Sequence, residues 1–312
     1  MTFSATLPPV LLVRAGGLGD VLLLRRAVAR VRVAGHSPWL WVPGRYGSAL
    51  LGPGEADAIL DWDSPETARV LGRPDRAPAA FGNRLGRVVG VIAFSRGLEV
   101  ALAGLQVGCV ARDPQPPPGW HAADWYENGV IEALGSGEPI PALAPCGTTP
   151  DERAEAQALL RRLPSGFLAV HAGSGSASKN WPARRFLELA QILSPNHPWL
   201  LIEGPAEPRA GSIPDGTDRA VVARGLGLRV LGTALAQSGL YVGNDSGVTH
   251  LAAAWGAPTI ALFGPTDPAI WAPTGPHVTV LRAPRGDLSL LGVADVARAA
   301  GPMLSRRALP CG

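Results

Sequence analysis

Residues 240–255 read LYVGNDSGVTHLAAAW, and this stretch decides how the chain folds. The apolar run 240–243 predicts a buried strand, and residues 248–255 predict the helix that follows it. Small and polar residues carry the chain from the strand to the helix, which is typical of a parallel α/β sheet. Because ligands of such sheets bind beyond the carboxyl ends of the strands, the same stretch predicts a binding site.

The turn between that strand and helix has the composition of an anion site. Ser246, Gly247, Val248 and Thr249 lie around the helix start, where backbone N–H groups and hydroxyls form a cradle and the helix dipole favours negative charge. A simpler interpretation makes Ser246 an N-cap. For His250, which follows, the alternative is a packed or capping histidine.

A second anion-competent loop follows an earlier strand, predicted at residues 167–170. Residues 171–182 read HAGSGSASKNWP, and they precede a helix predicted to end near residue 193. The small residues let the backbone approach a phosphate, and Lys179 adds a compact positive charge. Lys179 is the only lysine of the chain. The alternative is an exposed loop with a solvated lysine.

A third strand-to-helix turn lies near the start of the chain. Residues 10–13 predict a buried strand, residues 14–20 read RAGGLGD, and a helix is predicted over residues 18–34. The glycines do not have the G-x-G-x-x-G spacing, so a dinucleotide site is not indicated. Asp20 is either a partner of the helix dipole or a catalytic carboxylate.

The remaining pattern predicts two successive α/β domains, residues 1–145 and 151–312. Residues 114–119 and 138–150 are rich in proline and are predicted to connect them, with a helix at 120–134 in between. Further strands are predicted at residues 39–42, 58–60, 88–94, 107–111, 199–202 and 259–263, and a further helix at 151–162.

Composition narrows the class of protein. The net charge of +3 and the pI of about 9.0 suit an anionic substrate, but they are too weak to indicate a nucleic-acid partner. The three cysteines fit neither a disulfide framework nor a zinc site, and no cluster of ligating residues predicts a metal. With no apparent signal peptide and no apolar run of about 18 residues, the sequence predicts a cytoplasmic protein.

Together these motifs resemble glycosyltransferase family 9. The resemblance is carried by Gly-Leu-Gly-Asp at 17–20, Lys-Asn-Trp-Pro at 179–182, Gly-Asn-Asp-Ser-Gly-Val-Thr-His at 243–250 and Phe-Gly-Pro-Thr-Asp-Pro at 263–268. It implies a GT-B fold, in which two Rossmann-like domains face a central cleft. It also implies that the N-terminal domain binds the acceptor and the C-terminal domain the nucleotide sugar.

The resemblance assigns roles to particular residues. Asp20 matches the catalytic base, Lys179 the lysine near the donor phosphates, and Asp245 an acid near the donor sugar. Glu207 matches, less securely, a residue that holds the ribose. Ser246, Gly247, Val248, Thr249 and His250 match the phosphate-binding loop. Residues expected on the acceptor side are Gly17, Gly19 and Arg96.

The implied activity is inverting transfer of a sugar, heptose from ADP-heptose, to a lipopolysaccharide-core or related anionic glycan, with no cofactor or metal required. Alternatives are a nucleotide-sugar 2-epimerase and a non-catalytic nucleotide-sugar-binding protein. Four arginines of the first helix also predict weak attraction to an anionic acceptor or to the inner membrane as a peripheral contact. The alternative is a solvated helix face. These arginines are Arg25, Arg26, Arg30 and Arg32.

Overall fold

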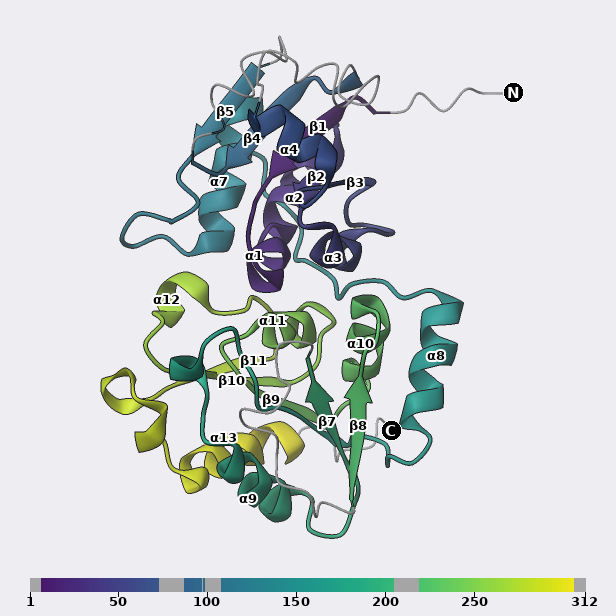
Figure 1. Ribbon diagram of the computed structural model, residues 1–312, viewed down its shortest axis with the longest axis vertical. Coiled ribbons are helices and arrows are strands. Elements are labelled where there is room, and N and C mark those ends of the chain that lie inside the picture. Colours follow the sequence, from purple (N-terminus) through teal and green to yellow (C-terminus); the bar gives the residue numbers. More distant parts are fainter. Residues whose placement is uncertain (1–6, 73–86, 97, 99–107, 205–218, 306–312) are drawn as a thin grey trace. The chain divides into compact units, whose positions relative to one another are not determined.

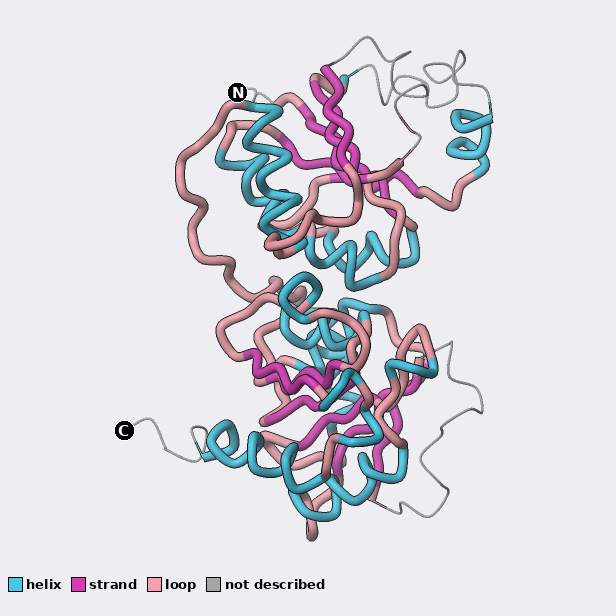
Figure 2. The backbone as a smooth tube through the Cα atoms, turned by 90° about the vertical axis from the view of Figure 1, so that its left-hand side faces the viewer, coloured by secondary structure: helices cyan, strands magenta, loops and turns pink. Residues whose placement is uncertain are grey.

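The computed structural model describes residues 7–72, 87–96, 98, 108–204 and 219–305. The chain forms two compact units, Met1–Ala144 (unit 1) and Pro145–Gly312 (unit 2). Each unit has its own parallel sheet with helices outside the strands (Figures 1 and 2). In the described part of the chain, no helix combines the length and the hydropathy needed to cross a membrane.

The sheet of unit 1 has five parallel strands in the order β3-β2-β1-β4-β5. β1 lies at the centre of this sheet, and its five residues are apolar and buried. Apolar runs of this kind favour strands that are covered on both faces. The strands are β1 (Pro9–Val13), β2 (Ser37–Val42), β3 (Ala58–Asp61), β4 (Gly90–Phe94) and β5 (Gly108–Arg112).

Helices connect these strands. α2 and α7 pack against each other, and α7 also packs on β4 and β5. The described helices of unit 1 are α1 (Leu18–Leu23), α2 (Arg25–Val33), α3 (Gly44–Gly47), α4 (Pro65–Gly72) and α7 (Ala122–Leu134). The first helix is not continuous as predicted, because α1 ends and α2 begins at Leu24. The segment 114–119 is not an inter-domain connection either, since α7, which follows it, packs within unit 1.

The arginines of α2 are paired inside unit 1. Arg25 and Arg30 are buried against Glu55 and Glu127. Arg26 also pairs with Glu127, at 2.6 Å, and Arg32 with Asp57, at 2.6 Å. The predicted attraction of this helix to an anionic surface therefore loses its basis, because its charges are neutralised by neighbouring carboxylates. The alternative of a solvated face is also wrong for the two buried arginines.

The sheet of unit 2 has six parallel strands in the order β11-β10-β9-β6-β7-β8. β9 and β10 are fully buried, whereas the edge strands β8 and β11 are half-exposed. The strands are β6 (Leu168–His171), β7 (Trp199–Glu203), β8 (Ala220–Arg224), β9 (Leu240–Asn244), β10 (Thr259–Phe263) and β11 (Val278–Arg282).

Two helix pairs, α8 with α10 and α9 with α13, accompany this sheet. A core containing Trp181, Phe186 and Trp199 fills the space between α9, α13 and the strands. The described helices of unit 2 are α8 (Pro150–Leu160), α9 (Ala183–Leu193), α10 (Leu228–Leu235), α11 (Gly247–Ala254), α12 (Pro268–Trp271) and α13 (Val293–Ser305), with a short 3-10 turn, η4, at Ala177–Lys179.

Candidate functional site

Each sheet has one point where the chain reverses the direction in which strands are added. In unit 1 this switch lies between β1 and β4, and in unit 2 between β6 and β9. Loops that leave the two strands at a switch diverge, and ligands of open α/β sheets bind in the space they leave. The motifs singled out in the sequence follow β1, β6 and β9, so both switch points are occupied by candidate residues.

In unit 2, the loop after β6 returns to the loop after β9 through an ion pair. Lys179 ends the turn η4, and its Nζ lies 2.8 Å from Oδ2 of Asp245. The side chain of Asp245 is largely buried, with 8% of its surface exposed. The side chain of Lys179 has 34% of its surface exposed. The lysine is therefore held in place by Asp245 and still reaches solvent.

Asn244, the last residue of β9, fastens the same two loops through its buried amide. Its Oδ1 accepts from the backbone N–H of Trp181 at 2.9 Å, and its Nδ2 donates to the carbonyl of Ala172 at 2.7 Å. Trp181 is itself buried and donates from its indole to the carbonyl of Leu291. A buried amide with both ends satisfied fixes the loop geometry, because breaking it would strand polar groups away from water.

The start of α11 is left open by its own N-cap. Ser246 has extended backbone at that position, but its side chain makes no capping hydrogen bond to the helix. Its hydroxyl lies 3.2 Å from Nδ1 of His171 and 3.2 Å from Oγ1 of Thr249 instead. Ser246 is therefore the N-cap residue, as the simpler interpretation predicts, but its side chain does not cap the helix.

The residues of the turn between β9 and α11 differ in solvent exposure. Ser246, Gly247 and Val248 are half-exposed, whereas Thr249 and His250 are buried. The first N–H groups of a helix have no partner within it. The open end of α11 therefore presents backbone N–H groups and the positive end of the helix dipole beside a loop that carries Lys179, an arrangement suited to an anion.

In unit 1, Asp20 occupies the first turn of α1 and is held from two sides. Its Oδ2 accepts from the N–H of Gly17 at 2.8 Å, and its Oδ1 lies 2.5 Å from Nη2 of Arg14. A quarter of the Asp20 side chain remains exposed. The carboxylate thus forms a capping box at the start of its own helix, and part of it stays exposed to solvent.

Arg14 connects Asp20 to α7. Its Nε donates to the hydroxyl of Tyr126 at 3.0 Å, and its Nη1 donates to the carbonyl of Ala15 at 2.5 Å. The Tyr126 hydroxyl in turn donates to the carbonyl of Pro114. Burial raises the pKa of Tyr126 to about 12, a rise that the Arg14 charge opposes and the Asp20 charge supports. Tyr126 therefore stays a neutral hydrogen-bonding partner at physiological pH.

Gly16 is required by the tight turn around this carboxylate. A Cβ at position 16 would lie 2.6 Å from Oδ2 of Asp20, closer than such atoms approach. The glycine-rich loop therefore serves to wrap the chain around Asp20.

Arg96 follows β4 at the same switch point. It donates to Oδ2 of Asp113 at 3.0 Å from Nε and 2.7 Å from Nη2, and both side chains are exposed. The hydrogen bonds from Arg96 and from the N–H of Gln115 lower the pKa of Asp113 below its usual value. The pair forms a polar surface at the carboxyl ends of β4 and β5.

The structure thus brings together Lys179, Asp245 and the 246–249 turn in unit 2. Gly17 and Gly19 lie in the turn that bears Asp20, and Glu207 lies outside the described residues. The contacts of Asn244 and of His171 with the site were not predicted, although a polar residue ending a buried strand is a signal for both. Across the described ranges, no group of three or more His, Cys, Asp or Glu side chains could hold a metal ion.

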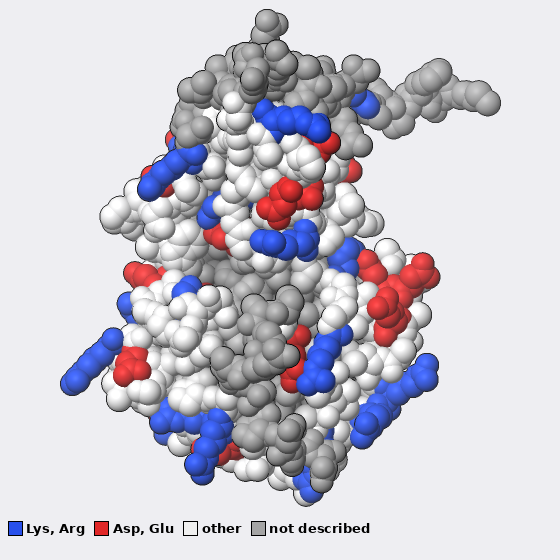
Figure 3. Space-filling model, in the orientation of Figure 1, with Lys and Arg blue, Asp and Glu red and all other residues white. Residues whose placement is uncertain are grey.

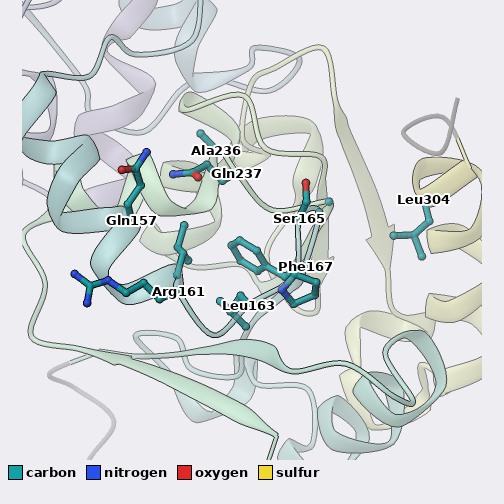
Figure 4. Close-up of a pocket in the computed structure, with 12 residues that line it drawn as sticks. Gln157, Arg161, Leu163, Ser165, Phe167, Ala236, Gln237 and Leu304 are labelled. Carbon is teal, nitrogen blue, oxygen red and sulfur yellow. The ribbon is translucent and has the colours of Figure 1, made fainter. Parts of the chain in front are cut away.

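A cavity of about 840 Å³ lies elsewhere in unit 2 (Figure 4). Its lining includes Phe167 and Gly239, which directly precede β6 and β9, so it lies at the amino ends of the strands, away from the loops described above. Among the described residues that line it, Arg161 is the one with a charged side chain. On the face shown in Figure 3, acidic and basic side chains are interspersed rather than gathered in one patch.

Solved structures share this architecture over nearly the whole chain. A family 9 glycosyltransferase from Veillonella parvula matches with a TM-score of 0.81 at 20% identity, covering 96% of this chain and 98% of that one. The E. coli heptosyltransferase WaaC with ADP matches with a TM-score of 0.71 at 22% identity, covering 95% and 99%. Two Rossmann-like domains of this kind define a protein of GT-B fold.

Sequence comparison finds the same family. The family described as "Glycosyltransferase family 9 (heptosyltransferase)" matches residues 143–294 of this chain. Lipopolysaccharide heptosyltransferase 1 of E. coli O18:K1:H7 is 30% identical over 178 residues, which are 55% of this chain and 52% of the relative. The chain spans about half the length of the curated relatives it matches.

Proposed function

We propose that this chain is an inverting glycosyltransferase that moves a sugar from a nucleotide diphosphate donor to a glycan hydroxyl. The observation that carries the proposal is the open start of α11 beside Lys179, at the switch point of unit 2. The N–H groups of Gly247 and Val248 and the lysine suit the two phosphates of such a donor. Both features stabilise the charge that develops on the diphosphate as it leaves.

Asp20 is the proposed general base. As the acceptor oxygen forms its bond to the anomeric carbon, the bond from that carbon to the diphosphate oxygen breaks, and the acceptor proton passes to the Asp20 carboxylate. Attack opposite the leaving group inverts the anomeric centre. Asp20 suits this role because Arg14 and Gly17 fix its orientation while part of the carboxylate remains exposed.

For the donor we propose ADP-heptose, and for the acceptor a lipopolysaccharide-core glycan. The support comes from relatives. Those matched in sequence are named lipopolysaccharide heptosyltransferase 1, and a structurally similar E. coli enzyme is described with ADP-2-deoxy-2-fluoro heptose. Arg96 in unit 1 is exposed and paired with Asp113, so the two side chains offer a donor and an acceptor for hydroxyl groups of an acceptor. No cofactor beyond the donor enters the proposed reaction.

Calorimetric titration of the full chain with ADP, UDP, GDP and dTDP tests the donor, and product analysis with ADP-heptose tests the reaction. We expect ADP to bind most tightly, and heptose to reach a core oligosaccharide only when both substrates are present. Interconversion of the donor sugar without an acceptor would favour the epimerase. Binding of ADP with no turnover of any kind would favour the non-catalytic protein.

A further inference from the structure

An exposed tryptophan lies on the loop that connects β5 to α7. Trp120 keeps 38% of its surface exposed, and its indole ring lies 5.7 Å from that of Trp125, nearly edge-on at 67°. Leaving a large aromatic ring in water forgoes the free energy that burial would give. A ring pair tilted in this way covers less flat surface than a face-to-face stack would.

This loop is firmly held by α7. Two consecutive residues of the helix bind two consecutive carbonyls of the loop, since Trp125 Nε1 donates to Asp113 at 2.9 Å and the Tyr126 hydroxyl donates to Pro114 at 3.2 Å. Arg112 lies against the Trp125 ring, 4.1 Å from its centre. Trp125 is therefore the support, and Trp120 is the more exposed member of the pair.

The same contacts relate Trp120 to Asp20. The Tyr126 hydroxyl that holds the loop also accepts from Arg14, and Arg14 binds Asp20. In Figure 1 the loop leading from β5 to α7 lies at the same end of unit 1 as α1. Asp113 starts this loop and pairs with Arg96, which follows β4, and the exposed pair supplies a donor and an acceptor for sugar hydroxyls.

We propose that Trp120 is a stacking platform for a pyranose ring of the acceptor glycan, an inference that rests on the proposed function. A pyranose ring carries C–H groups on its faces and hydroxyls around its rim. The C–H face packs on a flat indole through dispersion, while the rim binds polar groups at the edge of the platform. In this proposal Trp120 offers the flat surface, and the Arg96–Asp113 pair offers a donor and an acceptor for hydroxyls of the same glycan.

The test compares Trp120→Phe with Trp120→Leu in the full chain. Phenylalanine keeps a flat ring, whereas leucine keeps apolar bulk against Trp125 without one. The acceptor probe is a lipid-free core oligosaccharide from a heptose-deficient bacterial strain. We expect Trp120→Leu to raise the acceptor KM about 3- to 10-fold, Trp120→Phe to stay within about 2-fold, and ADP affinity to remain unchanged in both.

Saturation-transfer NMR supplies a readout that needs no turnover. Irradiation of the protein aromatic protons should saturate ring C–H protons of the bound oligosaccharide in the wild type and the phenylalanine variant, and less in the leucine variant. Ile192→Ala, at an exposed position on α9, is the control for loss of surface apolar area. Equal acceptor KM and equal saturation in both Trp120 variants would overturn the inference. If the wild type binds the oligosaccharide but transfers nothing, the proposed function fails while the NMR comparison still decides the platform.

Discussion

The two helix starts that follow β1 and β9 differ in what occupies them. At α1, the helix's own Asp20 accepts the N–H of Gly17, so a side chain of the protein fills the anion position. At α11, the Ser246 hydroxyl lies near His171 and Thr249, and it does not cap the helix. The same strand-loop-helix unit thus holds a built-in carboxylate in one case and is open to an external anion in the other.

This difference shows how one architecture can supply both parts of the proposed reaction. A helix start that is filled from within orients a carboxylate, which can act as a base. A helix start whose cap is diverted keeps its N–H groups for a ligand. Each helix start also has a basic residue beside it. Arg14 pairs with Asp20 at the start of α1, and Lys179 lies in the loop next to the start of α11.

The largest expected effect comes from removing the charge at the filled start. Asp20→Asn preserves the size of the side chain and an acceptor for Gly17, but it removes the base. We expect the transfer rate to fall about 10²- to 10⁴-fold while ADP affinity is unchanged. Asp124→Asn is the control, because Asp124 lies in the first turn of α7. Near-normal turnover of Asp20→Asn would reduce Asp20 to a helix cap.

The open start can be filled deliberately. Ser246→Asp places a carboxylate at the N-cap of α11, where like-charge repulsion against a diphosphate costs several kcal/mol, or about 10²-fold or more in the Kd for ADP. Ser246→Asn is the matched variant, since asparagine and aspartate are similar N-caps and differ in charge. Calorimetry should show weak ADP binding only for the aspartate. Equal affinity in the two variants would place the diphosphate elsewhere.

Removing the cation beside the open start should weaken ADP binding by about 1.5–3 kcal/mol, the contribution of a hydrogen bond to a charged group. The change is Lys179→Ala, measured by titration with ADP. Lys179→Arg should restore binding only in part, because the planar guanidinium has a different geometry. Arg184→Ala removes an exposed charge nearby in sequence, on α9, and should leave the affinity unchanged. An unaltered Kd in Lys179→Ala would return the lysine to a surface role.

A further effect, on stability rather than on binding or rate, concerns the tyrosine that supports Arg14 and Asp20 at alkaline pH. Because the folded pKa of Tyr126 is raised to about 12, its contribution to stability is fully present below the unfolded value of 10 and is lost as the pH rises from 10 to 12. The shift corresponds to roughly 2–3 kcal/mol. Urea unfolding at pH 9 and pH 11.5 should show a smaller decline for Tyr126→Phe than for the wild type. Tyr46→Phe, at a half-exposed tyrosine, should decline as the wild type does.

Sequence patterns were sufficient to predict the strands whose residues are all buried, because burial restricts those positions mostly to apolar residues. The apolar runs of β1, β9 and β10 are buried throughout, and each was predicted as a strand. The edge strands β8 and β11 were missed, and most residues of both are half-exposed. In β11 the apolar run is interrupted by Thr279, whereas β8 contains the short apolar run 220–223. The motifs themselves also predicted that Lys179 and the 246–249 turn belong to one site, through their resemblance to a known family.

The partners of these residues could not be predicted. Tyr126 lies 112 residues from Arg14 in sequence, and Asp245 lies 66 residues from Lys179. Such pairs depend on strand order, which brings β6 beside β9, and periodicity does not determine that order. The ion pairs of the α2 arginines were hidden for the same reason, since Glu55 and Glu127 come from distant segments.

Gly243 lies in β9, and the contacts of this position limit how the region can vary in sequence. A Cβ there would lie 2.3 Å from the Tyr241 hydroxyl oxygen and 2.9 Å from Oγ1 of Thr249. These two oxygens are themselves hydrogen-bonded at 3.0 Å. The three positions are therefore expected to covary as a unit. Gly243→Ala should be strongly destabilising alone and largely rescued when Tyr241 becomes leucine, a coupling that a double-mutant cycle of unfolding free energies would measure.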